Sequence, residues 1–410
     1  MQIRSVVWLG ILLFVTSISA LADGQTRLLG EKFIFTSEYL KGERVIDIYI
    51  PQDIDVSPIA LPTIYVLDSN VLFDVVVSTL KLRWERGLAP KAVIVGVRAR
   101  DAHERFGFAV PLKRLSGDAV VFSQSKPEVF DNFMRKELIP YIENLTNVNG
   151  YRAIIGLSPT STNVIYDYLN ESPLFSAHIA MAADFLATSS FNHSETSLKK
   201  LLVRKAKQSE GRFLYLSLAS EDRDNEPERA VPFVELQKDK SLRQFGLHAI
   251  IHDETEHYEH ASVAIIQAMS TLFPMSLWRP NYPLLREKPE MSLTFLTQFH
   301  QALEQKYKFN IRPFTHGYWT QNSVIGHIEY LVNAQHWHQA VSVSQWLSEK
   351  IPQVPKGYYL EALALQQLGK YKQALQAVNT GLSLKATLTD EDRAKLKQLK
   401  ASLTDAAQLP

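Results

Sequence analysis

The sequence predicts an α/β domain, a three-layer sandwich around a mostly parallel sheet, followed by an all-α domain of helical repeats. The first prediction rests on short apolar runs that alternate with helical patterns between residues 32 and 274. The second rests on a motif that recurs after 34 residues near the C-terminus. A chain of 410 residues with 46% hydrophobic content is long enough for two such domains. A formal net charge of +1 gives no reason to expect nucleic acid as a partner.

The predicted sheet begins with an antiparallel hairpin. Residues 32–51 alternate with period two on either side of Gly42, which is typical of paired strands at a sheet edge. Later runs are apolar on both faces or lie between helical segments, as expected of central parallel strands. These runs are residues 61–67, 92–97, 153–155, 175–181, 212–218 and 247–251, with helices expected at 71–82 and 130–143 among them.

The first residues have the pattern of a secretory signal. Arg4 precedes an apolar run of residues 6–18, and Ala20 and Ala22 form a small-x-small cleavage site. We therefore expect residues 1–22 to be removed and the mature protein to be periplasmic in a Gram-negative source. The apolar run is shorter than the roughly 20 residues that span a bilayer, and no later segment approaches that length, so no membrane contact is expected after cleavage. The chain has no cysteine, which excludes disulfides and thiol catalysis.

The C-terminal third reads as helical repeats. We expect the first domain to cover residues 23–275, a Pro-rich linker 276–291, and a helical region 292–405. Within it, residues 336–341 (HWHQAV) recur as residues 370–375 (KYKQAL). This offset is the tetratricopeptide period, and the repeats are expected at about 322–389. Such helices would recruit a protein partner or a second copy of the chain.

Residues 151–169 have the pattern of a strand, a sharp turn and a helix. The turn carries Gly156 and Ser158, and a serine in this setting is presented as a nucleophile. Pro159 follows, at the position whose backbone N–H normally binds the oxyanion, and proline has no N–H. The loss of one donor costs roughly 3 to 4 kcal/mol of transition-state stabilisation unless a group such as the Thr160 or Ser161 hydroxyl replaces it.

The order of these segments resembles a known family. FTSEYLKGERVIDIYIP, PTIYVLDSNVLF, PKAVIVGV, FDNFMRKELIPYIE, YRAIIGLS and HASV occur in the order and spacing of the putative esterase family of α/β-hydrolases, over about residues 32–274. That family includes esterase D-like enzymes and siderophore esterases. The resemblance implies an α/β-hydrolase fold, serine esterase chemistry and no metal or other cofactor. It is weakest at the turn, where the family usually has Gly-His-Ser-x-Gly-Gly.

The chain order of such triads is serine, acid, histidine, so the partners of Ser158 should lie further along the chain. His260 is the first choice for the base because HASV resembles the family's motif before its final helix, and His257 is the alternative. The acid should lie just after the strand at 212–218, where Glu221, Asp222 and Asp224 are candidates. Asp222 is preferred and Glu221 is the second choice. By analogy with the family, the second oxyanion donor is expected from the backbone at Ser69 or Asn70.

The sequence admits two other interpretations, a metal site and a protein that does not turn over substrate. The segment HDETEHYEH lacks the His-Glu-x-x-His order of a zinc site, so no metal is expected. The predicted function is that of an exported serine esterase, acting on a small-molecule ester through an acyl-enzyme. The alternative is a binding or scaffold protein that kept the hydrolase fold, lost turnover and acts through its repeats.

Overall fold

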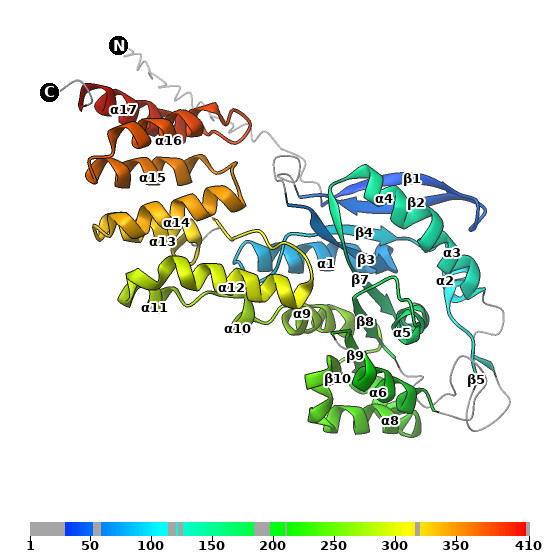
Figure 1. Cartoon of the computed structure of the whole chain (residues 1–410). Helices are drawn as coiled ribbons and strands as arrows, with labels where there is room; N and C mark the ends of the chain where they lie inside the picture. The colour runs from blue at the N-terminus through cyan, green and yellow to red at the C-terminus, as the bar shows by residue number, and fades with distance from the viewer. Residues whose placement is uncertain are drawn as a thin grey trace, which may run out of the picture.

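A twisted eight-stranded sheet forms the centre of the first domain (Figure 1). The computed structural model describes residues 29–51, 59–113, 120–121, 126–183, 197–209, 211–315 and 320–406, so the predicted signal peptide lies outside the described residues. The strands, in their order across the sheet, are β1 (Glu31–Ser37), β2 (Gly42–Tyr49), β4 (Val93–Val97), β3 (Leu61–Leu67), β7 (Val148–Leu157), β8 (Ala177–Met181), β9 (Phe213–Ala219) and β10 (Leu247–His252). A separate small hairpin pairs β5 (Leu112–Lys113) with β6 (Val120–Val121).

Strand directions agree with the predicted class. β1 and β2 pair antiparallel, and β2 pairs antiparallel with β4. From β4 to β10 every neighbouring pair is parallel. Because side chains on both faces of β3 and β4 are buried, helices must cover both sides of the sheet. The α/β prediction is confirmed.

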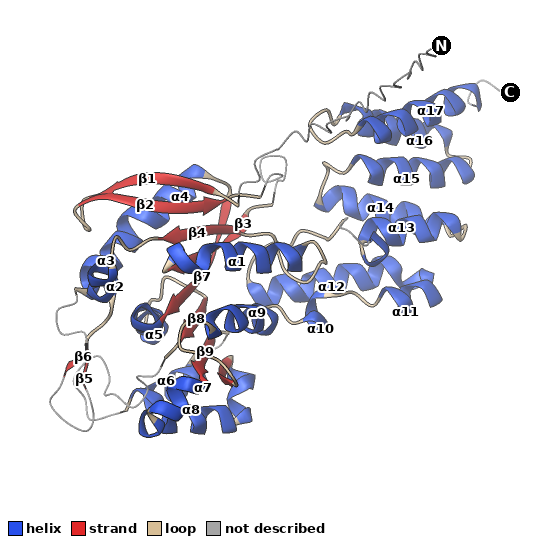
Figure 2. Cartoon of the chain, turned by 180° about the vertical axis from the view of Figure 1, so that it is seen from behind, coloured by secondary structure: helices blue, strands red, loops and turns tan. Residues whose placement is uncertain are grey.

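Helices lie on both faces and complete the three layers (Figure 2). One core contains the inward sides of α3 (Pro127–Phe133), α4 (Ile139–Leu145), α5 (Ser161–Leu169), α6 (Leu198–Gln208) and α8 (Pro227–Lys238). The opposite core contains those of α1 (Ser69–Trp84) and α9 (His260–Leu272). Two shorter helices, α2 (Ala102–Phe108) and α7 (Ser220–Asn225), follow β4 and β9 at their carboxyl ends.

The helix predicted at 130–143 is irregular in the structure. It consists of α3, a π turn over Met134–Leu138, and α4. Pro140 near the start of α4 has no N–H to donate to the preceding turn. The wider π turn directly before it accommodates the missing hydrogen bond within a continuous helical path.

The C-terminal helices stack beside the sheet domain (Figure 1). They are α10 (Met275–Trp278), α11 (Tyr282–Glu287), α12 (Ser292–Tyr307), α13 (Val324–Asn333), α14 (Trp337–Lys350), α15 (Pro355–Gln367), α16 (Tyr371–Ser383) and α17 (Asp390–Ala406). The repeat seen in the sequence falls at equivalent places, since α14 begins at Trp337 and α16 begins at Tyr371.

The segment predicted as a linker is packed rather than open. Trp278, Tyr282 and Leu285 are all buried, because α10 and α11 place them against neighbouring helices. The Trp278 Nε1–H donates to the Tyr307 hydroxyl at 3.1 Å, and that hydroxyl donates to the Leu272 carbonyl at 2.7 Å. Helix α12 is therefore joined to α9, and the two parts of the chain share a core.

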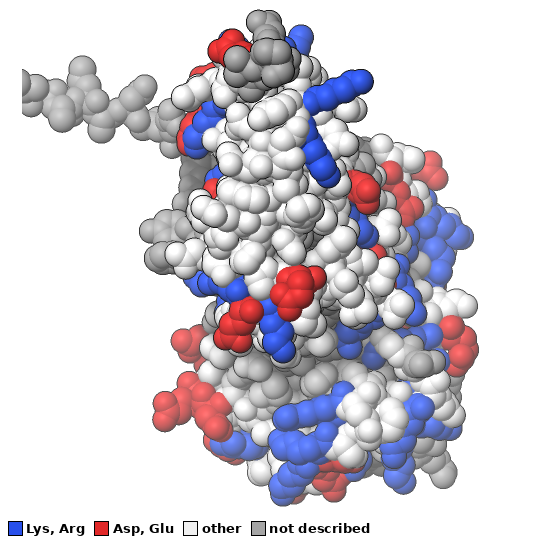
Figure 3. Space-filling model, turned by 60° about the vertical axis from the view of Figure 1, so that its left-hand side comes forward, with Lys and Arg blue, Asp and Glu red and all other residues white. Residues whose placement is uncertain are grey.

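The surface differs between the two parts. Figure 3 shows that uncharged side chains cover most of the stacked helices on the face in view, and that charged ones are denser over the sheet domain below. In the part of the chain that the structure describes, no single helix is long and apolar enough to cross a membrane. One bent pair, His260–Leu272 with Met275–Glu287, meets the length and composition test together.

Candidate active site

The turn after β7 presents Ser158 in a strained backbone conformation. Ser158 has a φ of +56°, which is rare for a residue with a side chain and typical of strained functional turns. The chain then makes one 3₁₀ turn, Ser158–Thr160, and continues as α5. Gly156 makes this turn possible, because a Cβ there would lie 2.8 Å from the Thr160 carbonyl oxygen. The local sequence thus builds a sharp strand-to-helix turn with its serine at the apex.

Three side chains from distant segments meet at this apex. The Ser158 hydroxyl lies 2.9 Å from Nε2 of His257, and Nδ1 of His257 lies 2.7 Å from Oδ1 of Asp222. Both distances are those of hydrogen bonds, in which Nδ1–H donates to the carboxylate and Nε2 accepts from the serine. Asp222 belongs to α7, which follows β9, and His257 lies between β10 and α9. The arrangement is that of a nucleophile, a base and an acid that orients the base.

Glu221, the alternative acid, serves the same loop in another way. Its carboxylate accepts a hydrogen bond of 3.0 Å from the backbone N–H of His257. Asp222 therefore contacts the ring of His257, while Glu221 holds its main chain. The sequence predicted that both carboxylates follow β9, but it could not predict which of them contacts the ring of His257 and which contacts its backbone.

His260, the first choice for the base, does not reach Ser158. Its side chain is fully buried, its Nδ1–H donates to the His257 carbonyl at 2.7 Å, and its Nε2 accepts from the Ala182 N–H at 3.3 Å. The Ser217 hydroxyl lies 3.1 Å from the same Nε2. Burial lowers the pKa of His260 to about 4, so the ring is neutral near pH 7. The prediction that His260 is the base was wrong. His260 is the first residue of α9 and its ring points into the core, whereas His257, in the loop before α9, lies next to Ser158.

The segment expected to supply an oxyanion donor lies against the strand-to-helix turn of residues 156–160, here called the elbow. Asp68, directly before Ser69, accepts hydrogen bonds from the Thr160 hydroxyl at 2.5 Å and from the Leu157 N–H at 3.4 Å. Ser69 is buried and its hydroxyl donates to Asp47, whereas Asn70 is exposed. Among the described residues, the backbone N–H groups of Ser69 and Asn70 have no hydrogen-bond acceptor. These two amides of the first turn of α1 are therefore unpaired N-terminal helix donors within the described part of the chain.

The two hydroxyl groups considered as replacements for the missing Pro159 donor are both engaged. The Thr160 hydroxyl hydrogen-bonds to Asp68 and accepts from the Leu157 N–H at 3.0 Å. The Ser161 hydroxyl donates to the Ser158 carbonyl at 2.6 Å. Both side chains are buried. They stabilise the turn, and the structure does not bring either one to the face where the Ser158 oxygen meets His257.

An ion pair beneath the elbow was missed by sequence reasoning. The Arg105 Nε–H donates to Asp68 at 2.5 Å, and an Nη2–H donates to the Leu157 carbonyl at 3.0 Å. Its guanidinium also lies 5.6 Å from the centre of the Tyr258 ring, next to His257. Burial raises the pKa of the Asp68 carboxyl, while Arg105 and the hydrogen bonds act in the opposite direction. In the sequence, Arg105 belongs to a polar loop after β4 that also contains Arg98 and Arg100, and such a composition is equally typical of a solvent-exposed loop.

We expect Arg105→Met to lower the free energy of unfolding by about 3 to 5 kcal/mol, because it leaves the Asp68 carboxylate buried without its cation. Urea unfolding of the full chain measures the change. Arg135→Met is the matched control, since Arg135 forms a half-exposed pair with Asp131 and should cost less than about 1 kcal/mol. Equal losses in the two variants would contradict the assigned role of Arg105.

Comparison with known proteins identifies the family of the chain. A family model described as "Putative esterase" matches residues 37–273, which is more than half of the chain. The chain belongs to this esterase family. None of the curated proteins matches the sequence. Family membership supports an esterase function.

Solved structures show how far the fold of this esterase extends. An uncharacterised protein from Capnocytophaga ochracea is 16% identical, with a TM-score of 0.59 over 92% of this chain and 99% of that one. An IroE-like serine hydrolase from Shewanella oneidensis is 18% identical, with a TM-score of 0.53 over 82% of this chain and 99% of that one. A siderophore hydrolase, EstB from Aspergillus nidulans, is 14% identical, with a TM-score of 0.47 over 61% of this chain and 97% of that one. The first two coverages extend beyond residue 273, so the likeness in fold includes part of the helical region.

Proposed function

We propose that this esterase is a serine hydrolase that cleaves a carboxylic ester through Ser158, His257 and Asp222. The observation that carries the proposal is the continuous chain of hydrogen bonds from the Ser158 hydroxyl through both ring nitrogens of His257 to Asp222. In this order the base can take the serine proton, and the carboxylate can stabilise the resulting imidazolium.

The reaction proceeds in two steps. The Ser158 oxygen attacks the ester carbonyl while His257 Nε2 takes its proton, and the oxyanion is met by the backbone amides of Ser69 and Asn70. His257 then gives its proton to the departing alcohol, which leaves Ser158 acylated. A water molecule, deprotonated by His257, attacks the acyl carbon and releases the acid. The serine regains its proton, so atoms and charge balance over the cycle.

Covalent labelling tests the proposal directly. Phenylmethanesulfonyl fluoride should add one sulfonyl group to the folded chain at Ser158, with release of fluoride and parallel loss of p-nitrophenyl acetate hydrolysis. Intact-mass measurement and peptide mapping locate the group. Chain denatured before treatment is the control and should not react. A label on another serine, or full activity of the labelled protein, would contradict the proposal.

Pro159 favours the alternative of a hydrolase fold that has lost turnover, because it removes one oxyanion donor and the nearby hydroxyls are engaged. We expect Pro159→Ala to raise kcat for p-nitrophenyl acetate by about 10- to 100-fold, since it restores a backbone N–H beside Ser158. Removing proline should cost no more than about 1 kcal/mol of stability. Pro232→Ala, a proline inside α8 far from the elbow along the chain, is the matched control.

An unchanged or lower kcat in Pro159→Ala would mean that another group already fills the position or that the turn needs the proline. Wild-type hydrolysis no faster than that of Ser158→Ala would favour the scaffold function. In that case the chain would function by binding a partner through its helical region.

We also propose that the esterase is exported and that its helices act as tetratricopeptide-like repeats. The N-terminal pattern around Arg4 and Ala22 supports export to the periplasm. The equivalent starts of α14 and α16 support a repeat that binds a protein partner or a second copy of the chain. The substrate is a small-molecule ester, as the family membership suggests.

A further inference from the structure

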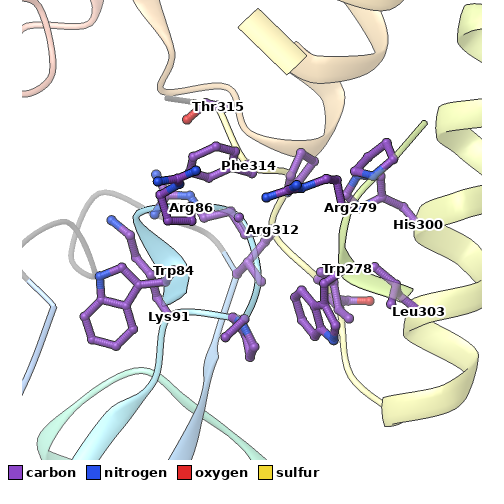
Figure 4. Close-up of a pocket in the computed structure, with 18 of the residues that line it drawn as sticks. Trp84, Arg86, Lys91, Trp278, Arg279, His300, Leu303, Arg312, Phe314 and Thr315 are labelled. Carbon is purple, nitrogen blue, oxygen red and sulfur yellow. The ribbon is translucent and has the colours of Figure 1, made fainter. Parts of the chain in front are cut away.

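A cavity lies where the sheet domain meets the helical region (Figure 4). Its walls come from the start of β3, the end of α1 and the turn after it, α12, and residues 309–315. It encloses about 100 Å³. A cavity of roughly 150 Å³ accepts a benzene ring, so a ring-sized ligand here would keep part of its surface at the mouth of the cavity, where Arg86 is exposed.

The cavity is separate from the active site. It is lined by Leu61 at the amino end of β3, and Leu61 is in register with Val148 at the amino end of β7. Ser158 follows the carboxyl end of β7. Strands rise about 3.3 Å per residue, so the length of β3 separates the cavity from the nucleophile by about 20 Å. The cavity lies at the amino ends of the parallel strands and Ser158 at their carboxyl ends.

Positive charge predominates in the cavity walls. The described lining residues include Arg86, Lys91, Arg279 and Arg312 but only one carboxylate, Glu85. In Figure 4, Arg86 and Arg279 approach from opposite sides of the cavity with Phe314 between them. The Nε of Arg279 is buried without a hydrogen-bond partner among the described residues. A buried donor left unsatisfied is unfavourable, and a bound anion would supply its acceptor.

Aromatic rings provide the apolar part of the walls. Trp84 is buried and stacks on Tyr49 with ring centres 5.8 Å apart, and Trp278 is fixed by its hydrogen bond to Tyr307. Phe314 lies over the turn that follows α1. Gly87 in that turn has a φ of +66°, and a Cβ there would come within 2.8 Å of the Phe314 ring. The walls are thus held in place from both parts of the chain before any ligand enters.

His300 adds a neutral polar group to the same cavity. It is 4% exposed, it lines the cavity, and its Nδ1 has no hydrogen-bond partner within the described part of the chain. Burial, and to a smaller extent Lys350, lowers the pKa of His300 to about 3, so its ring is uncharged near neutral pH. An unpaired, buried ring nitrogen in the lining that also contains Arg279 offers a hydrogen bond to a ligand that carries oxygen atoms.

We propose that this cavity binds an aromatic carboxylate. The ring of the ligand lies among the side chains of Trp84, Trp278 and Phe314, and its carboxylate contacts Arg279, Arg86 and His300. Such a ligand contacts the sheet domain through the end of α1 and the helical region through α12. Its binding therefore stabilises the junction between the two parts of the chain and does not compete with an ester at Ser158.

Benzoate is the probe, measured by isothermal calorimetry with the full chain. We expect saturable binding that weakens at least tenfold in Arg279→Gln and in Arg86→Gln, and that weakens with added salt. Arg204→Gln is the matched control, because Arg204 is exposed on α6, and its affinity should equal that of the wild type. Benzamide, which has the same shape without the charge, and acetate, which lacks the ring, should each bind at least tenfold more weakly.

Thermal unfolding checks the consequence for the junction, since saturating benzoate should raise the melting temperature of the wild type but not of Arg86→Gln. Arg86 is exposed, so its substitution tests the site even where Arg279→Gln fails to fold. Protein sulfonylated at Ser158 should bind benzoate as the unmodified protein does. Absence of saturable binding, equal affinity for benzamide or acetate, unchanged affinity in both arginine variants, or loss of binding after sulfonylation would each overturn the proposal.

Discussion

Ser158→Ala will lower kcat for p-nitrophenyl acetate by a factor on the order of 10⁴ to 10⁶, to the level given by binding and oxyanion stabilisation alone. The substitution removes the oxygen that accepts the acyl group, and it leaves His257 and Asp222 in place. Because the only hydrogen bond of the Ser158 hydroxyl among the described residues is the 2.9 Å contact with His257, the free energy of unfolding should change by less than about 1 kcal/mol.

Steady-state kinetics on purified full chain measures this loss, with far-UV circular dichroism to show that the variant is folded. Ser276→Ala is the matched control, since Ser276 is an exposed serine of α10 and its removal should leave kcat unchanged. A Ser158→Ala variant that retained more than about a tenth of the wild-type kcat would exclude Ser158 as the nucleophile.

His257→Gln will lower kcat by about 10⁴-fold or more, because no other described side chain lies within hydrogen-bond distance of the Ser158 hydroxyl to take its proton. Its effect on stability should be small, since the His257 ring lies at the surface of the site and is 22% exposed. The same assay and the same folding control apply. Activity retained in His257→Gln and abolished in His260→Gln would reverse the assignment of the base.

His260→Leu is expected to act differently, because His260 positions the His257 loop without touching the serine. The change leaves the His257 carbonyl and the Ala182 N–H without their partners, so we expect kcat to fall about 10- to 100-fold with little change in KM. His260→Gln can donate to the carbonyl and accept from the amide, and it should recover much of the lost kcat. A fall in stability without this recovery would indicate a purely structural role.

The pH dependence of stability gives an independent measure of His260. Its folded pKa, about 4, lies below the unfolded value near 6.5, so the unfolded chain takes up the proton first as the pH falls. The stabilising contribution of the neutral ring is therefore complete above pH 6.5 and is lost between pH 6.5 and 4. His260→Gln should lose about 1 to 2 kcal/mol less than the wild type between pH 7.5 and 5.0, as measured by urea unfolding.

Local patterns were enough to predict the elements that build the site. The buried strand before Gly156 and the helical spacing after it predicted the elbow, and the run after β9 predicted that the acid would come from Glu221 or Asp222. In the same way, the alternating pattern around Gly42 predicted the edge hairpin. These features depend on residues that are neighbours in sequence, so a sequence pattern can report them.

Contacts between distant segments could not be predicted in the same way. His257 and His260 are three residues apart, and only the start of α9 and the packing of β8 and β9 against it decide which ring enters the core. Arg105 and Asp68 are 37 residues apart, and nothing near either residue shows that they pair under the elbow. The residues 276–291 read as a linker because they are rich in proline, yet Trp278 and Tyr282 are buried against neighbouring helices.

The sequence by itself determined the parallel sheet, the position of the serine and the helical nature of the C-terminal region, because apolar periodicity and turn residues act within a few residues of one another. The tertiary structure decided which histidine faces Ser158, which hydroxyls are engaged in the turn, and that the two parts share a core around a basic, aromatic cavity. Those outcomes depend on burial and on pairing across long loops, and burial is a property of the whole chain rather than of any segment in it.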